Sequence, residues 1–164
     1  MADLHDLSLA HYSAKPLLSV HSRETNGRKV GIGKPTGLWV SVDGKHDWPA
    51  WCRAEEFAIA SLDCRTRVWL KHDVRVLHLA GATAIKLFTR EYAQDHPYPL
   101  SRTIDWSRVG SKYQGIIIAP YCWDCRYSDD TFWYYSWDCA SGCIWDADAI
   151  ASLEPVEELE SAHA

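Results

Sequence analysis

The chain has 164 residues, a formal net charge of −5 at pH 7 and nine tryptophans. This length suits one domain with a single buried core. Residues 154–164 hold four glutamates and no Lys or Arg, so we expect one domain over 1–153 and an acidic, disordered tail over 154–164. Without those glutamates, 17 basic residues face 18 acidic ones, which excludes a strong overall attraction to nucleic acid.

Nothing in the sequence indicates a membrane protein. No apolar run approaches the roughly 18 residues that a membrane span requires, and the first residues lack the basic-then-apolar pattern of a signal peptide. We therefore expect a cytoplasmic monomer without a membrane partner. In that compartment the six cysteines stay reduced, as buried thiols or metal ligands.

The first half of the chain predicts two strands, two helices and a basic loop that contains three glycines. A proline suits the first turn of a helix, and an aspartate is a good N-cap. The predicted elements are a strand over 7–13, a short helix over 15–21 that contains Pro16, a loop over 22–34, a strand over 35–42, and a helix over 48–61 that is capped by Asp47 and contains Pro49.

The second half predicts mostly strands. We expect strands over 66–70 and 74–79 joined by a tight turn at 71–73, a helix from Thr83 to Tyr92, one helical turn capped by Asp105, a buried strand over 115–119, and strands over 131–137 and 143–145 separated by a turn at 140–142. Helices and strands in this order indicate an α+β fold, because a doubly wound sheet would alternate them strictly.

Four cysteines suggest one alternative, a structural zinc site. Cys122 and Cys125 are separated by two residues, and Cys139 and Cys143 by three, so the set offers the four thiolates of a tetrahedral site. Against this, residues four apart in a regular strand lie about 13 Å apart. The alternative function is a non-enzymatic zinc-binding interaction module that uses its tryptophans as a platform.

Three short motifs on predicted strands point to a different function. The first strand ends in His11-Tyr12-Ser13, the second contains the run KPTGLWVS at 34–41, and the late strands contain WDCASGCIWD at 137–146. Together they resemble the ADP-ribosyltransferase family, in particular its small bacterial and phage toxin-type members, over about residues 7–150. This resemblance implies a split antiparallel β-sheet core with flanking helices, and NAD as co-substrate.

The resemblance also implies roles for individual residues. Cleaving the nicotinamide–ribose bond passes through an oxocarbenium-like centre, which needs groups that fix the ribose and a nearby carboxylate. The resemblance implies His11 at the adenosine-side ribose, Ser13 at the nicotinamide amide, Trp39 against the nicotinamide ring and Ser41 in the sheet crevice, with Tyr12 as a further NAD-binding residue. The basic loop would close over the pyrophosphate through Arg23, Arg28 or Lys34.

The catalytic acid departs from the family pattern. The family's glutamate falls at Ser141, which is no acid; Asp138 is the nearest carboxylate, and Glu56 is a distant reserve. Taken alone, His11 and Trp39 could equally be core residues. The expected reaction transfers ADP-ribose to a macromolecular acceptor, with a nucleic-acid base slightly favoured over protein or water. A degenerate family member that binds NAD without turnover is a further alternative.

Overall fold

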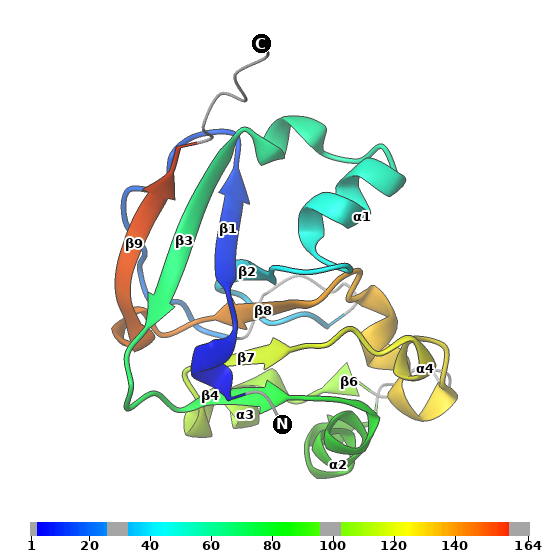
Figure 1. Ribbon diagram of the computed structural model, residues 1–164. Coiled ribbons are helices and arrows are strands. Elements are labelled where there is room, and N and C mark those ends of the chain that lie inside the picture. Colours follow the sequence, from blue (N-terminus) through cyan, green and yellow to red (C-terminus); the bar gives the residue numbers. More distant parts are fainter. Residues whose placement is uncertain (1–2, 26–32, 96–102, 158–164) are drawn as a thin grey trace.

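The computed structural model describes residues 3–25, 33–95 and 103–157, and seven strands of this part form one sheet (Figure 1). Their order across the sheet is β4-β7-β8-β2-β1-β3-β9. The strands are β1 Leu9–Ser13, β2 Leu38–Val42, β3 Cys64–Leu70, β4 Val76–Leu79, β7 Gly115–Ile118, β8 Ser141–Ile144 and β9 Ile150–Val156. Neighbours are antiparallel except β4 and β7, which are parallel, so the α+β class is confirmed and the purely antiparallel sheet is corrected to a mixed one.

The sheet bends sharply between β1 and β2. Only two residue pairs join these strands, Leu9 with Val42 and Ala10 with Ser41. Figure 1 shows β1, β3 and β9 running steeply across the direction of β2, β8 and β7. The sheet therefore has two halves, β1-β3-β9 and β2-β8-β7-β4, and we call the junction of β1 with β2 the seam.

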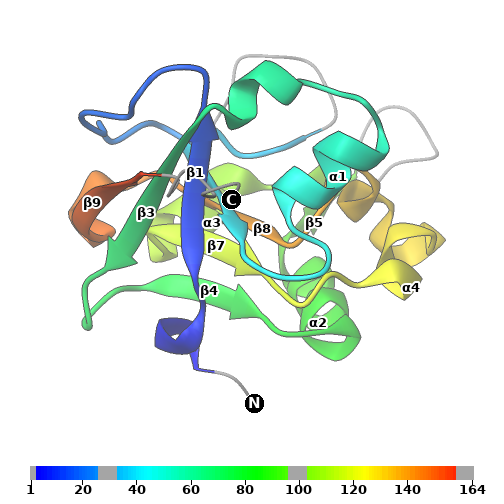
Figure 2. The same cartoon turned by 45° about the horizontal axis from the view of Figure 1, so that its top comes forward.

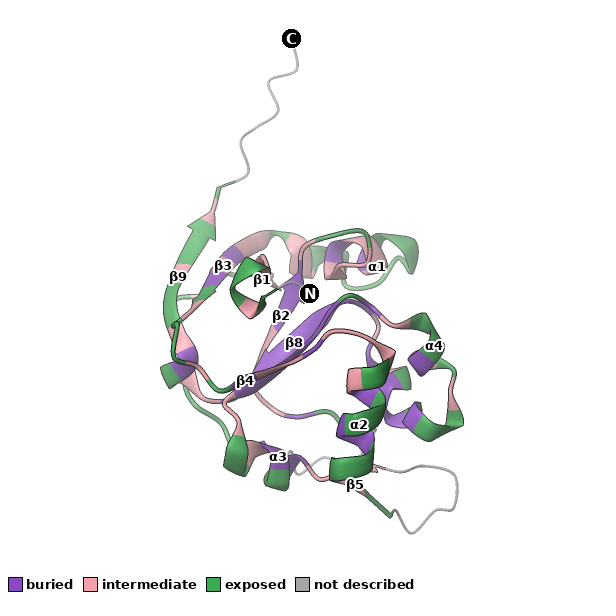
Figure 3. Cartoon of the chain, turned by 60° about the horizontal axis from the view of Figure 1, so that its bottom comes forward, coloured by how far each residue is buried: buried purple, intermediate pink, exposed green. Residues whose placement is uncertain are grey.

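Short helices pack around the sheet. They are the α-helices α1 Trp48–Ala54, α2 Ala82–Tyr92, α3 Trp106–Lys112 and α4 Trp123–Arg126, and the 3-10 helices η1 Leu4–Asp6, η2 Ile59–Leu62, η3 Asp129–Ser136 and η4 Ala147–Ala149. A separate two-stranded sheet pairs β5 Ala93–Gln94 with β6 Thr103–Ile104. Every residue of β7 and β8 is buried, so the core lies on these central strands (Figure 3). In the described part, no helix has the length and apolar character to cross a membrane.

Two predicted helix caps are confirmed. The Asp47 carboxylate accepts a hydrogen bond from the backbone N of Ala50 at 2.9 Å, and Asp105 accepts one from Arg108 N at 3.1 Å. Helix α1 ends at Ala54 rather than at residue 61, because the backbone turns left-handed at Glu56. The cap predicted at Thr83 is wrong, since the N-cap of α2 is Gly81, with a φ of 135°.

Two predicted elements have a different secondary structure. Residues 15–21 form no helix, and none of them is buried, so no packing stabilises so short a helix. Residues 131–137 were predicted as a strand, but most of them belong to the 3-10 helix η3. The buried side chains in this stretch are Thr131, Trp133, Tyr134 and Trp137, and the adjacent pair Trp133 and Tyr134 breaks the alternation of a strand with one buried face.

The predicted hairpin over 66–79 is wrong. Strand β3 pairs with β1 and β9, whereas β4 pairs with β7 in the other half of the sheet. The predicted turn at 140–142 is also wrong, because Ser141 and Gly142 belong to the buried strand β8. A glycine fits there because a Cβ atom on Gly142 would lie 2.5 Å from the carbonyl oxygen of Ile116 on β7.

The predicted tail begins inside the fold. Residues 154–156 complete β9, where Glu154 pairs with Arg67 and Val156 with Arg65 of β3. The domain therefore extends beyond the predicted boundary at residue 153. The rest of the predicted tail, 158–164, lies outside the described residues.

Candidate functional site

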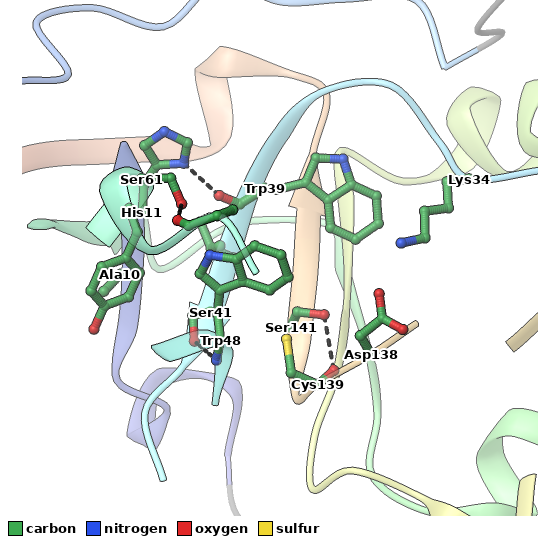
Figure 4. A pocket seen from close by; sticks show the side chains of 13 residues that line it. Ala10, His11, Lys34, Trp39, Ser41, Trp48, Ser61, Asp138, Cys139 and Ser141 are labelled. Atoms are coloured by element: carbon green, nitrogen blue, oxygen red, sulfur yellow. Dashed lines mark hydrogen bonds between the residues drawn. The ribbon is translucent and has the colours of Figure 1, made fainter. Parts of the chain in front are cut away.

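A cavity of about 480 Å³ lies at the seam, where β1 and β2 diverge (Figure 4). Its walls come from β1, β2, the start of β8, helix α1 and the segments just before β2 and β8. Six of the predicted ribose, ring, crevice and acid residues line it: His11, Tyr12, Trp39, Ser41, Asp138 and Ser141. The fold thus brings together three motifs that are far apart in the sequence.

His11 is held in one orientation by a backbone group. Its Nδ1 lies 2.7 Å from the carbonyl oxygen of Trp39, and a carbonyl only accepts, so Nδ1 carries the hydrogen. In the neutral ring Nε2 then has a free lone pair that accepts a hydrogen bond. This imidazole can therefore bind a hydroxyl group in a fixed direction, as a ribose requires.

Two indoles form the apolar part of the cavity. In Figure 4, Trp39 and Trp48 lie between His11 on one side and Asp138 on the other. Trp39 contacts the edge of Trp137 at 4.9 Å between ring centroids, and Trp48 stacks on Trp51 at 5.1 Å. Since each ring is backed by a second aromatic ring, both are fixed surfaces on which a flat ligand can stack.

Two buried serines organise the floor of the cavity, and they are direct partners across β2 and β8. Ser41 Oγ accepts a hydrogen bond from the backbone N of Trp48 at 2.9 Å and so ties the start of α1 to β2. Ser141 Oγ donates to the carbonyl oxygen of Cys139 at 3.0 Å. Both hydroxyl groups are therefore engaged in holding the protein backbone.

Asp138 is the acidic residue of the cavity wall. Its Oδ1 lies 3.5 Å from Nη2 of Arg126, and its side chain keeps 27% of its exposure. Arg126 is itself held by Tyr121 Oη and by the carbonyl oxygen of Trp137. Among the described residues no backbone N–H donates to Asp138, so it caps no turn, and its second carboxylate oxygen is available to a ligand.

Lys34, one of the three basic residues predicted at the pyrophosphate, also lines the cavity, and the structure adds Trp48, which was not predicted. The Nζ of Lys34 lies 5.2 Å from the centroid of the Trp39 ring. Burial lowers the pKa of Lys34, and the nearby Asp138 carboxylate partly offsets this effect. Trp48 directly follows the capping residue Asp47, but no local sequence pattern indicates that the start of α1 lies against the cavity.

Two predicted residues lie elsewhere. Ser13 is outside the cavity and donates its hydroxyl hydrogen to the carbonyl oxygen of Lys15 at 2.7 Å. Arg23 is exposed, and its backbone N bonds to the carbonyl oxygen of Trp145, just past the end of β8 that is remote from Ser141. Figure 2 shows residues 14–25 looping towards the side of β9, away from α1. Most of the predicted basic loop, 26–32, lies outside the described residues.

The four cysteines of the zinc alternative do not assemble a site. Within residues 3–25, 33–95 and 103–157, no three His, Cys, Asp or Glu side chains lie close enough together to hold a metal ion. Burial raises the pKa of the Cys125 and Cys139 thiols to about 12. Cys143 is buried in β8, with its Sγ 3.8 Å from the carbonyl oxygen of Pro35. These side chains act as small apolar residues of the core.

The cavity therefore combines two fixed indoles, an oriented imidazole, a carboxylate and an ammonium group. This set suits a ligand with a flat ring, sugar hydroxyls and a negatively charged group. Comparisons of the chain with protein-family models, with curated proteins and with solved structures found no match.

Proposed function

We propose that the protein is an NAD-dependent ADP-ribosyltransferase that binds NAD in the cavity at the seam. One observation carries the proposal: the residues implied by the resemblance at the ribose, the ring and the acid position, His11, Trp39 and Asp138, line the same cavity. The volume of about 480 Å³ lies within the roughly 300–1,000 Å³ of small-molecule sites. A sheet that bends between β1 and β2 also agrees with the split sheet expected of this family.

The nicotinamide ring, a ribose and the pyrophosphate of NAD each have a matching group in the cavity. The nicotinamide ring stacks on the Trp39 indole, and a ribose hydroxyl donates to Nε2 of His11. Lys34, whose Nζ lies over the Trp39 ring, supplies a charge-assisted hydrogen bond to the pyrophosphate. The binding contacts thus come from both halves of the sheet, because His11 lies on β1 and Trp39 on β2.

The proposed reaction is a substitution at the anomeric carbon of the nicotinamide ribose. The bond between this carbon and the nicotinamide nitrogen breaks, and both electrons leave with nicotinamide, which becomes neutral. A nucleophilic atom of the acceptor forms the new bond and gives its proton to Asp138 or to water. The Asp138 carboxylate stabilises the positive charge that develops on the ribose in the transition state.

Labelled NAD and calorimetry test the proposal. The wild-type protein is expected to bind NAD and to release nicotinamide, and Asp138→Asn to lose at least 100-fold of this turnover while its NAD affinity changes only a few-fold. Asp148→Asn, which changes an exposed acid of η4 outside the cavity, is the matched control and keeps full activity. Absence of NAD binding by the wild-type protein would refute the proposal.

A second function, NAD binding without turnover, is favoured by Ser141. This residue stands at the family's glutamate position, and its hydroxyl is engaged with the carbonyl oxygen of Cys139. Calorimetry and a nicotinamide-release assay separate the two functions. A protein that binds NAD without turnover loses NAD affinity when His11 or Trp39 is replaced, but it releases no nicotinamide.

A further inference from the structure

The segment that precedes Asp138 carries a cluster of exposed aromatic side chains. Large apolar side chains that are exposed in the described part number nine, and four of them lie within residues 123–135. They are Trp123, Tyr127, Phe132 and Tyr135, with exposed fractions of 44–69%. We call these four residues of α4, η3 and their connection the aromatic surface. Such a cluster marks an interaction site, whereas single exposed apolar residues are ordinary.

The four rings are arranged as two stacked pairs in contact. Trp123 stacks with Tyr127 at 6.4 Å between centroids, and Phe132 with Tyr135 at 5.5 Å. Tyr127 and Tyr135 meet edge to face at 6.4 Å and so join the pairs. The aromatic surface is therefore continuous and presents several ring faces and edges to a partner.

This surface already binds one guanidinium group. The Cζ of Arg126 lies 4.9 Å from the Tyr135 centroid and 5.9 Å from the Tyr127 centroid. The same guanidinium reaches Asp138 at 3.5 Å. Arg126 therefore connects the aromatic surface directly to the acidic wall of the cavity, and a partner on the surface lies next to the proposed reaction centre.

The charges around the rings favour a positively charged partner. The exposed charged residues of the segment 122–137 are Asp124, Asp129 and Asp130, and its one basic residue, Arg126, is 15% exposed and paired with Asp138. Asp130 shares a small hollow with Lys86 and Arg90 of α2, whereas Asp124 and Asp129 make no ion pair with any described residue. A phosphate backbone would be repelled by these carboxylates, but a guanidinium group both pairs with carboxylates and stacks on aromatic rings.

We infer that the aromatic surface binds an arginine-containing polypeptide segment, which is the acceptor of the proposed transfer. The acceptor role rests on the proposed function, but the binding itself does not require NAD. In the transfer, a guanidinium nitrogen forms the new bond to the ribose carbon, nicotinamide leaves with the electrons of the broken bond, and the nitrogen's proton passes to Asp138 or to water.

Calorimetry of the full chain without NAD tests this inference, with a synthetic arginine–glycine repeat peptide as the probe. We expect binding that weakens with added salt, and a loss of about two- to fivefold in affinity for Trp123→Ala and for Tyr127→Ala, which is the size of one exposed cation–π contact. Trp69→Ala is the matched control, since Trp69 on β3 is 49% exposed and Trp123 is 46% exposed. Its affinity for the peptide is expected to equal that of the wild type.

Three results would overturn the inference. The first is that the wild-type protein does not bind the peptide. The second is tighter binding of single-stranded oligothymidine than of the peptide, which would assign the surface to nucleic acid. The third is that Trp123→Ala and Tyr127→Ala bind the peptide as well as Trp69→Ala does. Peptide binding by a protein that does not bind NAD would leave the aromatic surface as a polypeptide site and refute only the transferase proposal.

Discussion

At the scale of single residues, short motifs predicted which side chains would lie at one cavity. His11, Trp39 and Asp138 were singled out from their motifs, and the cavity contains all three. Trp48 was missed as a cavity residue, because nothing local in the sequence shows that the start of α1 closes the same space as β1 and β2. Arg23 was predicted at the pyrophosphate but lies outside the cavity, because the residues after β1 loop towards β9.

Lys34 provides the test at this scale. If its ammonium group binds the pyrophosphate, Lys34→Met removes a charge-assisted hydrogen bond and is expected to weaken NAD binding roughly 10- to 100-fold. Lys45→Met is the control, since Lys45 lies outside this cavity. Calorimetry measures both affinities, and a loss of less than threefold for Lys34→Met would show that the phosphates lie elsewhere.

At the scale of elements, the sequence predicted helix starts better than strand partners. Asp47 and Asp105 accept hydrogen bonds from backbone groups three residues away, so their role as helix caps can be predicted from the local sequence. The partners of β3 and β4 depend on contacts between distant segments, which no local pattern records. Ser141 and Gly142 read as a turn because glycine favours turns, but the space between β8 and β7 is what requires a glycine here.

Gly142 tests this reading of β8. In Gly142→Ala the new methyl group would lie 2.5 Å from Ile116 O and 2.7 Å from the Ile117 side chain, so β7 and β8 must separate. We expect a loss of roughly 2–4 kcal/mol in the free energy of unfolding, measured by urea denaturation. Gly33→Ala is the matched control, because the nearest atoms lie 3.9 Å from its added methyl group, and a similar loss in both variants would contradict the argument.

At the scale of the whole molecule, the α+β class was predictable from the order of elements, but the number of strands was not. The acidic residues after 153 suggested a tail, although Glu154 belongs to β9. An edge strand has one solvent-facing side, and charged residues there are common. Composition alone therefore could not distinguish an edge strand from a disordered tail. Residues 131–137 read as a strand, although most of them belong to the 3-10 helix η3.

Alkaline pH is expected to destabilise the whole fold. Burial raises the pKa of Cys125 and Cys139 from 9.0 to about 12 and also raises the pKa of Tyr121 and Tyr134. Below pH 9 these four groups are protonated in both the folded and the unfolded protein, and the free energy of unfolding keeps its full value. Their contribution to this free energy is lost as the pH rises from 9 to 12, because the unfolded chain releases protons that the folded protein keeps. Lys34 acts in the opposite direction, since its pKa is lowered, but it is one group against several.

Thermal unfolding between pH 7.5 and 10.5 measures this effect. The Tm is expected to be constant up to about pH 8.5 and to fall by roughly 5–10 °C by pH 10. Cys139→Ala removes one of the responsible thiols and is expected to make the fall shallower than in the wild type. A Tm that stays constant to pH 10.5 would contradict the assignment.

The seam has a mechanical consequence. Only two residue pairs join β1 to β2, so the angle between the two halves of the sheet is weakly restrained by backbone hydrogen bonds. A ligand that contacts His11 on one half and Trp39 on the other restricts the movement of the two halves relative to each other. A bound ligand should therefore slow amide hydrogen exchange along β1 and β2 in particular. The width of the cavity depends on the angle between the two halves of the sheet, and ligand binding would fix that angle.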